Sequence, residues 1–219
     1  MIEPRSASSA PPAPSIWNLA NGLTVLRVLL VPVFGVLLLA DDGTDAAYRW
    51  WAFLIFAVAM MTDRIDGDIA RSRGMVTNFG KVSDPIADKA LVTMAVVGLS
   101  MIADVPWWAT TVVLVREWGV TAVRFWVIRH GVMAAGRGGK LKTLLQALAL
   151  GFLIMPRWTM PLPGLWDALA WTLFWVAVVV TVVTGVDYVA QALVLRRTSE
   201  RAAMKRARRT QRDRPGAGG

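Results

Sequence analysis

The stretch Asp63-Arg-Ile-Asp-Gly-Asp-Ile-Ala-Arg71 is an acidic segment that directly follows a run of apolar residues. Asp63 and Asp66 are three positions apart, and farther along the chain Asp84 and Asp88 are four apart. Residues at these spacings share one face of a helix. Two helices that meet at a membrane surface would therefore bring both pairs of carboxylates to one place. Each aspartate taken alone is more simply a solvated charge, and only the whole constellation favours a site.

Long apolar runs surround this segment and indicate the fold class. Of the 219 residues, 55% are hydrophobic, and the mean hydropathy is +0.48. A helix needs about 20 apolar residues to cross a bilayer, and the alternation of barrel strands is absent. We predict an all-α integral membrane protein with six transmembrane helices, the second and fifth extending into polar sequence. The six runs are 22–40, 48–62, 82–103, 107–128, 141–155 and 166–195.

The charges between the runs predict the orientation. Acidic residues lie between runs one and two and between runs three and four, whereas basic residues gather at the other connections and in the tail. The positive-inside bias places the basic side, and with six crossings both termini, in the cytoplasm. We therefore expect a multi-pass protein of the plasma membrane whose site faces the cytoplasm. Its expected parts are a disordered N-terminal segment (1–15), one six-helix domain (16–195) and a basic cytoplasmic tail (196–219).

Composition narrows the chemistry of the site. The chain has no cysteine and a single histidine, His130, which argues against disulfides and zinc centres. The net charge of +9 lies in loops and the tail, so we expect no nucleic-acid partner. Carboxylate oxygens favour hard ions such as Mg²⁺ or Mn²⁺. Two such ions, held by Asp63, Asp66, Asp84 and Asp88, can clamp a diphosphate.

Small residues and a cation accompany the aspartates. Gly67 and Ala70 each lie one turn after an aspartate, so a ligand can approach the helix backbone there. Gly80 opens the second helix in the same way. Arg71 offers a forked cation to a phosphate.

The complete pattern Asp63-x2-Asp66-Gly67-x2-Ala70-Arg71-x8-Gly80-x3-Asp84-x3-Asp88 resembles the signature of the CDP-alcohol phosphatidyltransferase family, with no position missing. The resemblance implies a six-helix membrane fold, usually a homodimer, with a site that faces the cytoplasm. It implies two metal ions on the aspartates and a cytidine nucleotide near Gly67, Ala70 and Gly80. It also implies that Asp88 is the general base for the acceptor hydroxyl.

Three further stretches resemble the phosphatidylglycerophosphate synthase subfamily. This resemblance implies transfer of a phosphatidyl group from CDP-diacylglycerol to sn-glycerol 3-phosphate, with Asn21 and Thr24 near the CDP-lipid. Ala20 stands where the subfamily usually has proline. The stretches are Asn21-Gly-Leu-Thr24-Val-Leu-Arg27, Arg116-Glu117 with Arg124, and Gly139-Lys140-Leu-Lys142-Thr-Leu-Leu-Gln146.

The charges of the fourth run agree with a phosphorylated acceptor. Arg116 and Glu117 lie well inside this run, where each charge costs at least about 2.5 kcal/mol and so faces a cavity and a partner. Adjacent residues point apart on a helix, so we expect Arg116 not to pair with Glu117. Arg116, Arg124, Lys140 and Lys142 can supply a cationic pocket for the acceptor phosphate. The alternatives are a structural ion pair for Arg116 and a purely topological role for the two lysines.

Other activities compete with this interpretation. A phosphatidylinositol phosphate synthase also takes a phosphate ester as acceptor, and a CDP-diacylglycerol-dependent cardiolipin synthase takes a lipid. A cation transporter would belong to a different class, but it predicts acidic groups at mid-membrane in repeat-related, broken helices. The aspartates here cluster at one cytoplasmic edge, and the stretch from Gly139 to Gln146 favours glycerol 3-phosphate.

Removal of divalent metal should abolish activity, because the predicted ligands are carboxylate oxygens that repel one another without cations. We expect EDTA to stop CMP release from CDP-diacylglycerol, and excess Mg²⁺ or Mn²⁺ to restore it. The measurement is CMP production by the purified protein. Full activity in EDTA would contradict the two-metal hypothesis.

Overall fold

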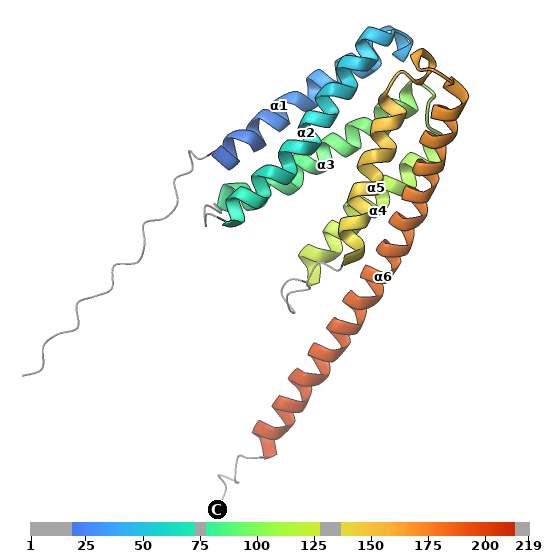
Figure 1. Cartoon of the computed structure of the whole chain (residues 1–219). Coiled ribbons are helices and arrows are strands. Elements are labelled where there is room, and N and C mark those ends of the chain that lie inside the picture. The colour runs from blue at the N-terminus through green and yellow to red at the C-terminus, as the bar shows by residue number, and fades with distance from the viewer. Residues whose placement is uncertain (1–18, 73–77, 128–136, 213–219) are drawn as a thin grey trace, which may run out of the picture.

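The computed structural model describes residues 19–72, 78–127 and 137–212, and all regular structure in these ranges is helical (Figure 1). The predicted all-α class is therefore confirmed for the described residues. Each predicted apolar run overlaps one helix, and α2 and α5 extend into polar sequence as expected. The helices are α1 (Leu19–Leu39), α2 (Ala46–Ser72), α3 (Asn78–Met101), α4 (Trp107–Val127), α5 (Arg137–Ile154) and α6 (Pro163–Arg212), with short 3-10 turns η1 (Ala40–Gly43) and η2 (Arg157–Thr159).

The hydropathy of these helices is uneven. Among the described residues, two segments are long and apolar enough to cross a membrane, Gly22–Gly43 and Pro163–Leu195. Three shorter apolar segments, Ala46–Thr62, Lys89–Met101 and Leu141–Ile154, lie within α2, α3 and α5. These three helices continue into polar sequence, and that polar sequence includes most of the residues predicted to form the site.

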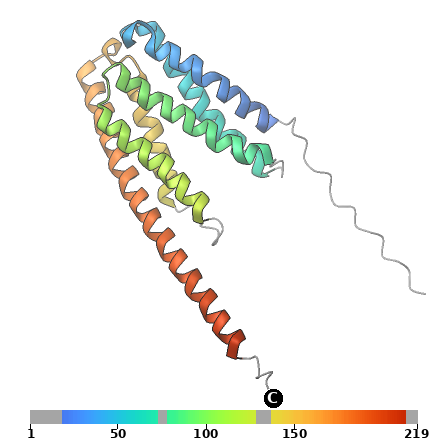
Figure 2. The same cartoon turned by 180° about the vertical axis from the view of Figure 1, so that it is seen from behind.

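The helices form two groups of three. Helix α1 packs along α2 and α3, and α6 packs along α5 and α4. Fewer contacts join the groups, mainly between α2 and α5 and between α3 and α4. The groups meet at the end that holds the α1–α2, α3–α4 and α5–α6 connections and splay apart toward the other end (Figures 1 and 2). The two groups are called the α1–α3 half and the α4–α6 half below.

Close backbone approach holds the α1–α3 half together. A Cβ atom on Gly35 would lie 2.4 Å from Met94 Cε, and one on Gly98 would lie 2.6 Å from Leu38 Cδ2. Phe34 and Leu38 of α1 are fully buried at this contact. Small residues at such positions let membrane helices pack through van der Waals contact, which is their main source of association in lipid.

A buried arginine connects the two halves where they meet. Arg49 of α2 is 1% exposed and donates hydrogen bonds to the carbonyl oxygens of Ile154 (2.7 Å) and Leu153 (2.6 Å). These carbonyls end α5 and lack partners within the helix. Arg49 also pairs with Asp104 Oδ2 at 2.7 Å, and its guanidinium lies 5.4 Å from the ring centroid of Trp158. Arg49 thus places a positive charge at the C-terminal, negative end of the α5 dipole, and Asp104 neutralises that charge.

A second buried arginine supports the same helix end. Arg157 Nη1 donates to the carbonyl oxygens of Leu153 (2.5 Å) and Phe152 (3.2 Å), and its Nε pairs with Asp167 Oδ1 at 2.6 Å. Sequence reasoning noted the acidic residues in the connections at this end but neither of these two arginines. Both of its arginines have an aspartate partner, so the end carries no excess positive charge from them.

Replacement of Arg49 should destabilise the protein. We expect Arg49→Met to lower the midpoint of thermal unfolding in detergent, because each lost charge-assisted hydrogen bond costs about 1.5–3 kcal/mol. Tryptophan fluorescence during heating measures the midpoint. Asp42→Asn is the matched control, since Asp42 is an exposed charge at the same end. Equal midpoints for the two variants would contradict a supporting role for Arg49.

Candidate active site

The helices that the acidic motif predicts are present. Helix α2 continues through Asp63 and Asp66 to Ser72, and α3 includes Asp84 and Asp88. No group of three metal-ligating side chains occurs among the described residues, but these four aspartate side chains are not among them. Their convergence on two metal ions stays a prediction. For several other predicted site residues, too, the structure does not describe the side chain or, for the glycines, its surroundings. Together with the four aspartates, these residues are Asn21, Asp63, Asp66, Gly67, Ala70, Arg71, Gly80, Asp84, Asp88, Arg124 and Lys140.

The start of α1 lies against the helix that carries the first aspartates. Arg27 is 1% exposed, and its Nε donates to the carbonyl oxygen of Ala59 at 3.3 Å. Ala59 lies one turn before Asp63 on α2. Thr24, one turn before Arg27 on α1, is also buried. The N-terminal stretch predicted to contact the CDP-lipid is therefore beside the acidic helix.

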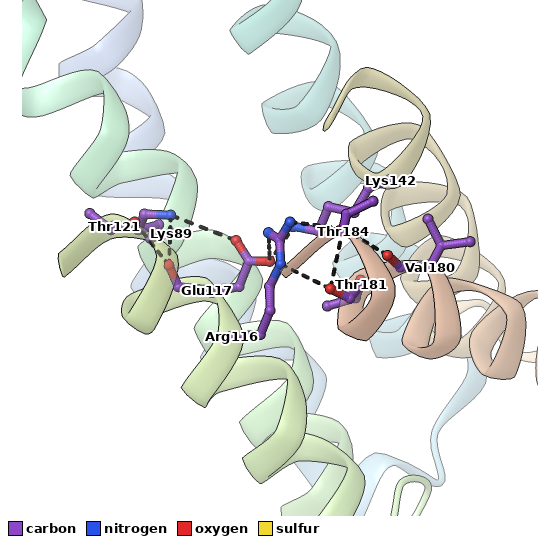
Figure 3. Close-up of polar contacts among 8 residues, drawn as sticks. All are labelled: Lys89, Arg116, Glu117, Thr121, Lys142, Val180, Thr181 and Thr184. Atoms are coloured by element: carbon purple, nitrogen blue, oxygen red, sulfur yellow. Dashed lines mark hydrogen bonds and ion pairs between the residues drawn. The ribbon is translucent and has the colours of Figure 1, made fainter. Parts of the chain in front are cut away.

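A buried carboxylate collects cations from three helices (Figure 3). Glu117 Oε1 accepts hydrogen bonds from Lys142 Nζ of α5 and from Arg116 Nη1 of α4, the latter at 3.1 Å. Lys89 Nζ of α3 lies 3.6 Å from the other carboxylate oxygen and 3.4 Å from the carbonyl oxygen of Glu117. These four side chains are at most 15% exposed. We call Lys89, Arg116, Glu117 and Lys142 the Glu117 cluster.

Arg116 extends this cluster to α6. Its Nε donates to the carbonyl oxygen of Thr181 at 3.1 Å, and its Nη2 donates to Thr184 Oγ1 at 3.0 Å. Gly185 provides the space, because a Cβ atom there would lie 2.8 Å from Arg116 Cγ. Figure 3 shows the guanidinium between α4 and α6, with one edge toward Glu117.

The prediction that Arg116 does not pair with Glu117 is wrong. The Cβ atoms of adjacent helical residues do point apart, but the arginine side chain is long enough to turn its guanidinium back toward its neighbour. Thr181 and Thr184 on α6 hold it in that position. Lys142 lies inside α5, which begins at Arg137 and so extends the predicted fifth run into polar sequence as expected, and the lysine is buried there.

The Glu117 cluster has an unbalanced charge. Among the side chains that the structure describes, three cations surround one carboxylate, so these four carry a formal net charge of +2. Charge in a poorly solvated place is costly unless a partner neutralises it. A phosphate monoester carries about −1.5 to −2 at pH 7 and matches this excess. Sequence reasoning singled out Arg116 and Lys142 for the acceptor but not Lys89, although Lys89 directly follows Asp88.

Comparison with known proteins identifies similar chains. A family model described as CDP-alcohol phosphatidyltransferase matches residues 17–183. A Mycobacterium tuberculosis protein named probable phosphatidylglycerophosphate synthase is 51% identical over 178 residues, which cover 81% of this chain and 83% of the relative. Two relatives are named CDP-diacylglycerol–glycerol-3-phosphate 3-phosphatidyltransferase. The Bacillus subtilis protein is 36% identical, with 79% of this chain and 94% of the relative covered. The Shigella flexneri serotype 5b protein is 35% identical, with 80% and 95% covered.

Filling the space beside Arg116 should cost stability. We expect Gly185→Ala to lower the thermal midpoint in detergent, because overpacking costs about 1–3 kcal/mol and outweighs the better helix propensity of alanine. Gly119→Ala is the matched control on α4, where a Cβ atom meets nothing within 4 Å. This control should equal or exceed the parent midpoint. A raised midpoint for both variants would show that Arg116 can move aside freely.

Proposed function

The chain belongs to the CDP-alcohol phosphatidyltransferase family, and we propose that it transfers a phosphatidyl group from CDP-diacylglycerol to sn-glycerol 3-phosphate. The products are phosphatidylglycerophosphate and CMP. Relatives with names for this activity match along most of both chains. The observation that carries the choice of acceptor is the buried Glu117 cluster, whose excess charge of +2 fits a phosphate monoester.

Each half of the protein serves one substrate. Helices α2 and α3 carry the aspartates proposed to hold two Mg²⁺ or Mn²⁺ ions and the small residues proposed to lie beside the cytidine diphosphate. Bound metal would neutralise the diphosphate and stabilise the leaving CMP. Helices α4 and α5 carry the acceptor cations, Arg116 and Lys142 in the Glu117 cluster, with Arg124 and Lys140 proposed beside them. Asp88 and Lys89 are neighbours in the chain, and Lys89 pairs with Glu117, so the two substrates would meet at α3.

The reaction is a displacement at phosphorus. Asp88 accepts the proton of the acceptor hydroxyl while the hydroxyl oxygen forms a bond to the phosphorus that bears the diacylglycerol. The bond from this phosphorus to the oxygen of CMP breaks, and CMP leaves with the electron pair. A positioned carboxylate base contributes about 10²–10⁴ in rate. Arg116 and Lys142 hold the acceptor phosphate by charge-assisted hydrogen bonds, so the hydroxyl end can point toward Asp88.

The membrane arrangement follows from the same distribution of residues. We propose six crossings of the plasma membrane, both termini and the site on the cytoplasmic side, and a homodimer. Buried arginines and lysines face the interior, whereas large apolar side chains cover the outside, as lipid contact requires. The basic tail of residues 196–219 would contact anionic lipid. Exposed apolar residues include Leu29, Val36, Val115, Val179, Val183 and Val186.

The acceptor is tested by CMP release from CDP-diacylglycerol in detergent micelles. Glycerol 3-phosphate should support turnover, whereas inositol 1-phosphate and phosphatidylglycerol should not. Turnover with inositol 1-phosphate alone would instead identify the protein as a phosphatidylinositol phosphate synthase. Turnover with phosphatidylglycerol alone would identify it as a cardiolipin synthase.

Lys142→Met tests the phosphate pocket and keeps most of the buried side-chain volume. We expect the KM for glycerol 3-phosphate to rise about 10- to 150-fold, because a charge-assisted hydrogen bond contributes about 1.5–3 kcal/mol. The KM for CDP-diacylglycerol should change little, which makes the second substrate the internal control. Equal effects on both substrates would favour a structural role for Lys142.

A further inference from the structure

The ion pair between Lys89 and Glu117 joins the two halves beside the proposed site. Lys89 lies on α3 and belongs to the α1–α3 half, whereas Glu117 lies on α4 of the other half. The lysine approaches both the carboxylate (3.6 Å) and the main-chain carbonyl (3.4 Å) of the same residue. Both side chains are at most 14% exposed, so solvent ions screen their attraction weakly. Because Asp88 precedes Lys89, the pair links the proposed base to the acceptor cations.

The carboxylate of Glu117 also determines where those cations lie. One oxygen receives both Lys142 and Arg116, and the other faces Lys89. Without this carboxylate, three cations from three helices would repel one another. Glu117 neutralises only one of the three charges, so it can hold the cations together and still leave them attractive to a phosphate.

We propose that Glu117 and Lys89 are positioning residues for the acceptor and act on it only through other side chains. This inference rests on the proposed function. Glu117 sets the site of the acceptor phosphate by holding Arg116 and Lys142, and Lys89 sets that site relative to Asp88. Only a short carbon chain separates the phosphate of glycerol 3-phosphate from its free hydroxyl. A displaced phosphate therefore displaces the attacking oxygen, and an error of about 1 Å can cost about 10²-fold in rate.

A positioning role predicts a loss in kcat without a loss in acceptor affinity. In Glu117→Gln the three cations remain, and the amide oxygen can still accept a hydrogen bond from Arg116 or Lys142, which limits how far they move apart. The KM for glycerol 3-phosphate should therefore stay within about threefold of the parent value or fall. The kcat should drop about 10- to 100-fold, because the phosphate binds in a wrong position. Lys142→Met shows the opposite pattern, a raised KM, since that lysine binds the phosphate itself.

The lysine is tested by a pair of substitutions. Lys89→Met removes the bridging charge and should lower kcat by about 10-fold or more. Lys89→Arg keeps a cation near the carboxylate and should restore at least half of the parent kcat. Thr121→Val is the matched control, because within the described residues the Thr121 hydroxyl bonds the carbonyl oxygen of Glu117 alone, at 2.9 Å, one turn along α4. It should leave kcat and both KM values unchanged.

The full-length variants are compared in the CMP-release assay with CDP-diacylglycerol, and size-exclusion chromatography in detergent reports folding. A kcat equal to that of the parent in both Glu117→Gln and Lys89→Met would overturn the positioning role. The proposed function is judged separately, by whether the parent protein is active with glycerol 3-phosphate. A raised KM at constant kcat would also overturn the positioning role, since that pattern marks direct phosphate binding. Loss of folded protein in both variants would show that the ion pair supports the fold, and this result would also overturn the positioning role. If the parent protein uses a different phosphorylated acceptor, the choice of glycerol 3-phosphate is wrong. A lower kcat of both variants with that other acceptor would still support the positioning role.

Discussion

The pairing of charges inside apolar helices is the constraint on which the rest of this structure depends. Each buried charge needs a partner, because its desolvation costs several kcal/mol. Two groups of buried charges, one around Arg49 and Arg157 and the other the Glu117 cluster, find their partners in different ways. At the end where the halves join, Arg49 and Arg157 pair with Asp104 and Asp167, and the charges balance. In the Glu117 cluster, three cations surround one carboxylate. The balanced cluster supports the fold, and the unbalanced one is the cluster that we propose to bind the acceptor phosphate.

Helix α5 connects these two clusters. Its last carbonyl oxygens accept hydrogen bonds from Arg49 and Arg157 at the joined end of the bundle. Its first turns carry Lys142, which is held by Glu117. A helix held at both ends cannot slide or rotate without the loss of several charge-assisted hydrogen bonds. The position of Lys142 therefore depends on contacts at the far end of the same helix as well as on its own ion pair.

The division into halves suits a transferase with two substrates. The α1–α3 half brings the buried N-terminal stretch of Thr24 and Arg27 against α2, which carries the first aspartates of the motif. The α4–α6 half positions Arg116 between α4 and α6. Fewer contacts connect the halves than hold each half together, and the ion pair between Lys89 and Glu117 is one of the contacts that join them.

The sequence by itself determined the helical class, the approximate helix limits, the family and the motif residues, because hydrophobic runs and residue spacing along a helix are local properties. The same local reasoning failed at Arg116 and Glu117, where it considered only the directions of adjacent Cβ atoms. It also missed the partners of Lys89 and Arg49, which lie 28 and 55 positions away in the chain. Only the tertiary structure decided these contacts, because long, flexible charged side chains take their positions from whichever opposite charge the packing of other helices brings within reach.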